Sequence, residues 1–101
     1  MTRYLLTKEA QEDLSGIREY LLREAGVRVT RRLLVAIVSA FHSLARNPGQ
    51  GHRREDLVSR EEVRFWPVFS YLVVYRIDRK PLTILAVIHG SRDVQRWLKE
   101  R

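Results

Sequence analysis

The chain has 101 residues, of which 45% are hydrophobic and 31% are charged. This length and composition fit one folded domain, residues 1–101, and exclude a second. It contains no cysteine, which excludes disulfides and thiolate metal sites and fits a reducing compartment. The formal net charge of +7 favours an acidic partner, either nucleic acid or an acidic protein, unless the arginines form only a solvated surface. No apolar run reaches the length of a signal peptide or a membrane span, so we expect a cytoplasmic protein with no membrane partner.

The first 26 residues of the chain predict a short strand followed by one helix. Residues 3–7 are apolar and β-branched enough for the strand, and Thr7 is a suitable N-cap for the helix after it. Gly26 suits the left-handed conformation that ends many helices. The core face of this helix is marked by apolar residues at helical spacing: Ala10, Leu14, Ile17 and Leu21.

A second helix is predicted from about residue 27 to residue 46, where Asn47-Pro48 stops it. Its core stripe consists of Leu33, Ile37, Ala40, Phe41 and Leu44. A further apolar set, Leu34, Val35 and Val38, makes the apolar face wider than one stripe. We expect that set to be an interface, because so small a chain cannot cover both sides of the helix. The two helices should form an antiparallel hairpin.

The second half predicts three consecutive strands after a polar loop at residues 48–61. They are expected at residues 63–66, 68–78 and 82–89, with Pro67 in the first turn. In the middle strand one face carries Phe69, Tyr71, Val73, Tyr75 and Ile77, and the other carries Leu72 and Val74. A short amphipathic helix with Val94, Trp97 and Leu98 should dock on that second face. The predicted class is α+β in β-α-α-β-β-β-α order, a small antiparallel sheet with a helical hairpin packed on one face and the first strand at an edge.

Chemical motifs are sparse. The three histidines lack metal-ligand spacing, no glycine-rich phosphate loop or nucleophile elbow occurs, and no cofactor is expected. A basic cluster is predicted near the sheet: His52, Arg53, Arg54, Arg64, His89 and Arg92. These groups have the chemistry of a metal-free ribonuclease, with histidine as acid or base and arginine stabilising the transition state. The alternative is structural: His89 ends a strand, Ser91 or Asp93 caps the tail helix, and Arg92 pairs with a nearby carboxylate.

The order of several short motifs resembles the RelE/ParE superfamily of type II toxins, and within it the ParE branch. The resemblance covers nearly the whole chain and includes Tyr4-Leu5-Leu6-Thr7, Asp13-Leu14, Asn47-Pro48, Val74-Tyr75-Arg76 and Val87-Ile88-His89-Gly90-Ser91-Arg92-Asp93. It implies a sheet with a helical hairpin packed on it, and a toxin neutralised by a small antitoxin encoded nearby. ParE-like members poison DNA gyrase, and contact DNA only through a ParD-like antitoxin; RelE-like members cleave mRNA on the ribosome.

The sequence departs from the RelE-like nucleases at three places. They carry an arginine where this chain has Leu72, a tyrosine shortly after the position of Arg92, and lysines in the strand that is Val63-Arg64-Phe65-Trp66 here. We therefore expect an inhibitor with no catalytic residues and no metal. The alternative is a RelE-like mRNA interferase, which would use Arg64, His89 and Arg92.

Two binding surfaces are expected for such a toxin. The antitoxin should cover exposed apolar groups at Leu34, Val35, Val38, Leu72 and Val74. An acidic antitoxin segment suits residues 27–46, which carry four basic and no acidic residues, and residues 68–101, which carry seven basic and three acidic. The cellular target should contact the basic tail through Arg92, Arg96, Trp97 and Lys99.

Overall fold

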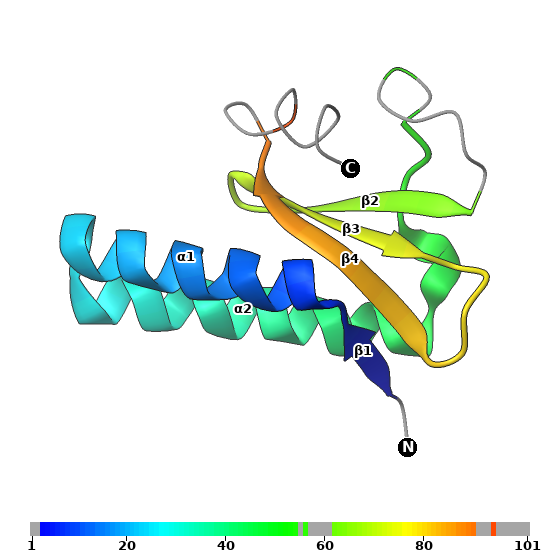
Figure 1. Cartoon of the computed structure of the whole chain (residues 1–101), viewed down its shortest axis with the longest axis horizontal. Coiled ribbons are helices and arrows are strands. Elements are labelled where there is room, and N and C mark those ends of the chain that lie inside the picture. The colour runs from blue at the N-terminus through cyan, green and yellow to red at the C-terminus, as the bar shows by residue number, and fades with distance from the viewer. Residues whose placement is uncertain (1–2, 55, 57–61, 91–93, 95–101) are drawn as a thin grey trace.

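The computed structural model describes residues 3–54, 56, 62–90 and 94. Within this part of the chain the predicted order is confirmed as far as the last strand (Figure 1). The elements are β1 (Tyr4–Leu6), α1 (Lys8–Glu24), α2 (Gly26–Arg46), a 3-10 turn η1 (Pro48–Gln50), β2 (Val63–Val68), β3 (Tyr71–Arg76) and β4 (Leu82–His89). The predicted tail helix falls outside the described residues except for Val94.

The four strands form one sheet in the order β1-β4-β3-β2. Strands β2, β3 and β4 make the antiparallel meander that their adjacency predicts. The first strand joins the edge as expected, but it runs parallel to β4, so the sheet is mixed rather than wholly antiparallel. At the end of β1 the Thr7 amide donates a hydrogen bond to the Ile84 carbonyl of β4 at 3.1 Å. Helix α1 begins at the next residue. No local pattern in residues 3–7 encodes the direction of β1.

The helices form the predicted antiparallel hairpin, which lies on one face of the sheet and extends past its end (Figure 1). Thr7 caps α1, since its side chain accepts a hydrogen bond from the Ala10 amide at 3.1 Å. Gly26 takes a positive φ of 86° at the sharp turn between the helices, a conformation that costs glycine little. Both expectations from sequence are confirmed.

The sheet is covered by apolar side chains on both faces. Toward the helices, Tyr71, Val73 and Tyr75 pack with the core stripes of α1 and α2. On the opposite face a smaller cluster contains Val63, Phe65, Val74, Ala86, Ile88 and Val94. The predicted alternation along the middle strand is therefore correct, and Val94 at the start of the tail is buried against the second face.

The turn between β2 and β3 differs from the prediction. Pro67 lies inside β2, opposite Leu72, and the turn is made by Phe69 and Ser70. Proline is tolerated there because β2 is an edge strand, where a missing N–H need not break the ladder. Phe69 therefore leaves the strand pattern: its φ is 55° and its side chain is 71% exposed.

Strand β4 contains an irregularity that α1 supports. The register shifts so that Val74 faces Ala86 and Tyr75 faces Ile84, which leaves Leu85 as a bulge. The Thr7 hydroxyl donates to the Leu85 carbonyl at 3.1 Å. Since β1 ends at Leu6, this part of the β4 edge is hydrogen-bonded by Thr7, the N-cap of α1, and no longer by a neighbouring strand.

Asp13 on α1 accepts a hydrogen bond from the Val87 amide through Oδ2 at 3.0 Å. Replacing Asp13 with alanine should lower the free energy of unfolding by about 1–3 kcal/mol, because the partly buried Val87 N–H loses its acceptor. Urea denaturation of the purified variant measures this loss. Asp13→Asn is the matched control, since its side chain keeps an acceptor oxygen; an alanine variant as stable as the wild type would contradict the assignment.

Candidate partner-binding surfaces

Helix α2 presents apolar side chains to solvent on the side away from the sheet. Ile37, Phe41 and Leu44 face the core, whereas Val35 is 60% exposed and Val38 is 37% exposed. Leu34 is partly exposed beside them. We call Leu34, Val35 and Val38 the α2 outer patch. It is apolar and open, as an unoccupied interface would be.

The other two residues predicted to contact an antitoxin lie elsewhere. Leu72 packs at the margin of the second cluster and is partly exposed, on the sheet face opposite the helices. Val74 is fully buried in that cluster. Its side chain therefore belongs to the core and offers no surface to a partner, because residues on that face pack with Val94 of the same chain.

The two described residues that a nuclease would use, Arg64 and His89, lie far apart on the sheet. Arg64 pairs with Tyr75 across the β2–β3 ladder, and His89 pairs with Tyr71 across the β3–β4 ladder. Four residue steps along β3 separate these pairs, which is about 13 Å at the usual rise per residue. His89 instead lies edge-on to the Tyr71 ring, with the ring centroids 5.5 Å apart. Arg92 falls outside the described residues.

His52 has a structural position at the outer edge of β2. Its backbone exchanges two hydrogen bonds of 2.8 Å with Phe65, and its ring stacks on Trp66 with centroids 6.0 Å apart. The loop thus covers part of an edge that would otherwise be open to pairing with another chain.

Tyr75 is a residue whose role the sequence did not reveal. Its hydroxyl donates to the Pro48 carbonyl at 2.6 Å and accepts from the Gly51 amide at 2.9 Å. Burial raises the pKa of Tyr75 above its ordinary value. Gly51 lies so close that a Cβ atom there would sit 2.1 Å from the Tyr75 oxygen. The only signal in the sequence is a tyrosine in a strand and a glycine in a loop, and neither points to the other.

Two of the arginines outside the helices form ion pairs with an aspartate two residues further along the chain. Arg54 forms an ion pair with Asp56 at 2.9 Å. Arg76 forms a bidentate ion pair with Asp78, with one hydrogen bond to each carboxylate oxygen. The hydrogen bond from Arg76 lowers the pKa of Asp78 below its ordinary value. The arginines of α2, by contrast, have no acidic residue on their own helix, so this helix carries much of the positive surface.

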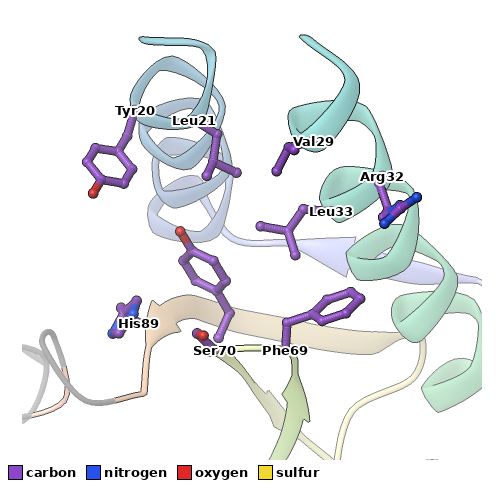
Figure 2. Close-up of a pocket in the computed structure, with 9 residues that line it drawn as sticks. Tyr20, Leu21, Val29, Arg32, Leu33, Phe69, Ser70 and His89 are labelled. Atoms are coloured by element: carbon purple, nitrogen blue, oxygen red, sulfur yellow. The ribbon is translucent and has the colours of Figure 1, made fainter. Parts of the chain in front are cut away.

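A cavity of about 350 Å³ lies between the turn of the helical hairpin and the end of the sheet (Figure 2). The helices and the sheet both contribute to its wall, which includes Leu21, Val29, Arg32, Leu33, Phe69 and His89. No pattern in the sequence indicates this cavity, because its walls come from regions that lie far apart in the chain.

Among the described residues, no three histidine, cysteine or acidic side chains gather as a metal site would require. In that same part of the chain, every helix is too short or too polar to cross a membrane.

Comparison with known proteins identifies the fold. A family model described as the ParE toxin of the type II toxin-antitoxin system parDE matches residues 4–94. The chain belongs to the ParE toxin family. It is thus a ParE-type toxin of a type II toxin-antitoxin system, and the resemblance seen in its sequence is confirmed.

Curated relatives span the same length as this ParE-family chain. Toxin ParE3 of Caulobacter vibrioides is 29% identical over 101 residues, covering 100% of this chain and 99% of its own. Toxin ParE of Escherichia coli is 29% identical over 103 residues, with coverages of 100% and 97%. A solved structure of the chromosomal ParDE system from P. aeruginosa has a TM-score of 0.72 at 21% identity, and the match covers 88% of this chain and 96% of that one. It shows the same fold.

Proposed function

We propose that this ParE-type toxin acts in the cytoplasm by binding and inhibiting DNA gyrase, without catalysis of its own, and that a ParD-like antitoxin neutralises it. The observation that carries the proposal is the family match across residues 4–94. The separation of Arg64 from His89 supports inhibition by binding, since general acid-base catalysis needs its groups within reach of one substrate.

The antitoxin part of the proposal is supported by the α2 outer patch. Val35 and Val38 are exposed apolar side chains on a helix that carries no acidic residue. A partner segment that lays apolar groups on this patch and acidic groups beside it would satisfy both features. Leu72 extends the proposed contact to the other face of the sheet, and buried Val74 is left out.

The target part of the proposal assigns gyrase contact to the tail. Its residues Arg92, Arg96, Trp97 and Lys99 lie outside the described part of the chain. What supports the assignment is the basic composition of residues 91–101 and their position directly after the last strand, which ends at His89.

Supercoiling of relaxed plasmid by purified gyrase tests the function. The wild-type protein should inhibit supercoiling, and equimolar antitoxin should relieve the inhibition. The double variant Arg92→Ala with Arg96→Ala should inhibit at least about tenfold less, because it removes two cations from the proposed contact surface. Arg18→Ala with Arg23→Ala on α1 removes the same charge elsewhere and should inhibit like the wild type.

Unimpaired supercoiling at saturating toxin would refute gyrase as the target. Primer extension on transcripts from induced cells provides the second arm of the experiment: discrete cuts that appear on induction would show that the chain is a nuclease.

A further inference from the structure

Phe69 occupies a backbone conformation that does not suit it. Its φ of 55° lies in the left-handed region, where a bulky side chain is strained and glycine is not. The ring is also 71% exposed, so the turn gains little burial in return. A strained residue that exposes an aromatic ring is unfavourable for the isolated chain. That combination points to a contact made outside it.

The ring borders the cavity between the helical hairpin and the sheet. Figure 2 shows Leu21, Val29 and Leu33 reaching from the two helices toward the space above Phe69. At about 350 Å³ the cavity is near the lower end of ligand pockets, which span roughly 300–1,000 Å³. Its wall combines aliphatic and aromatic side chains. This largely apolar lining and the size of the cavity suit one large apolar side chain and a little of the backbone that carries it.

The charge at the rim indicates the kind of partner. Arg32 lines the cavity, is exposed, and forms no ion pair with any residue in the described ranges. No carboxylate lines the cavity, and residues 26–46 contain four arginines and no acidic residue. An acidic partner is therefore favoured. A nucleic acid fits less well, because binding its phosphates would need several cations, whereas Arg32 is the one arginine or lysine among the described residues that line this cavity.

We propose that this cavity is an anchor site for the antitoxin: a large apolar side chain of an acidic antitoxin segment enters between Leu33 and Phe69, and a neighbouring carboxylate pairs with Arg32. The proposal rests on the proposed function. It adds a second contact region, at the turn of the helical hairpin, to the α2 outer patch. Phe69 then gains in the complex the burial that it lacks alone.

The variant Phe69→Gly separates binding from folding. Glycine relieves the backbone strain, so the melting temperature should stay equal or rise, whereas removal of the ring should weaken antitoxin binding at least about tenfold. The probe is the purified antitoxin encoded next to this toxin, titrated by calorimetry. The control is Leu5→Ala, which truncates another exposed apolar side chain, on β1 and away from the cavity, and should bind like the wild type.

Charge reversal tests the ionic part. Arg32→Glu should weaken binding at least about tenfold, and more at low salt, whereas Arg28→Glu makes the same charge change one helical turn away and should have a much smaller effect. If the wild type binds antitoxin and Phe69→Gly and Arg32→Glu bind as tightly, the cavity is not an anchor while the proposed function stands. If the wild type fails to bind antitoxin, the proposed function fails and the anchor site with it.

Discussion

Gly51→Ala is expected to lower the free energy of unfolding by at least about 2 kcal/mol, because it combines overpacking with the loss of hydrogen bonds. The new Cβ would lie 2.1 Å from the Tyr75 hydroxyl oxygen and 2.8 Å from two ring carbons. Tyr75 is fully buried and cannot move aside into solvent. The loop must therefore withdraw, and the hydrogen bonds from Tyr75 to Pro48 and from Gly51 to Tyr75 are lost. Thermal unfolding should show a fall in midpoint of roughly 10 °C.

Tyr75→Phe is the companion variant, since it removes the hydroxyl and leaves the ring. It should lose about 1–3 kcal/mol, because the Gly51 amide and the Pro48 carbonyl are left without this partner. In a double-mutant cycle the two changes should be less than additive, since both break the same contact. Additive losses would show that Gly51 matters for another reason.

The same hydroxyl makes stability depend on alkaline pH. Burial raises the pKa of Tyr75 above the ordinary tyrosine value of 10.0, so near and above that pH the unfolded chain releases the proton more readily than the folded one. The stabilisation is complete below pH 10.0 and is lost as pH rises toward the folded-state pKa. Urea denaturation between neutral and alkaline pH should show a shallower decline for Tyr75→Phe than for the wild type.

Val35→Glu combined with Val38→Glu is expected to weaken antitoxin binding roughly 100-fold, because it places two like charges against an acidic partner and removes apolar contact. Folding should be little affected, since both side chains are exposed and glutamate is a better helix former than valine. Cells that express this variant with its antitoxin should stop growing, whereas cells with the wild-type pair should grow.

The matched control adds the same charge to the other helix. Ser15→Glu with Gly16→Glu changes two exposed positions on α1, where a side chain at Gly16 meets nothing within 4 Å. This variant should remain neutralised. Continued neutralisation of the Val35/Val38 variant would exclude the α2 outer patch as an antitoxin contact.

Much of the fold could be predicted because its signals are local. The α1 stripe from Ala10 to Leu21, the Thr7 cap and the left-handed Gly26 each depend on neighbours within a few turns. Strand alternation likewise assigned Val73 and Val74 to opposite faces correctly. It could not say which apolar groups stay open: Val74 is covered by the chain itself, while Val35 is not.

The candidate site was less predictable, because its contacts join distant parts of the chain. The cavity is lined by residues from α1, α2 and the β2–β3 turn, among others. Phe69 in that turn has a positive φ, whereas the sequence placed it in a regular strand. Pro67 was the misleading signal, since proline marks turns unless an edge strand accommodates it.

The sequence by itself determined the element order, the two apolar faces of the meander, the basic character of α2 and membership of a toxin superfamily. Periodicity, capping chemistry and charge suffice for the first three, and each is a property of neighbouring residues. The superfamily was indicated by the resemblance of several short motifs in order along the chain. Only the tertiary structure decided that β1 runs parallel to β4, that Leu85 bulges, and that Tyr75 holds Gly51. The physical reason is sequence separation: the Thr7 hydroxyl meets a carbonyl 78 residues away, and the Tyr75 hydroxyl meets one 27 residues away. Such pairs form only when the helices and the sheet pack together, and the same packing leaves Phe69 and Arg32 beside an open cavity.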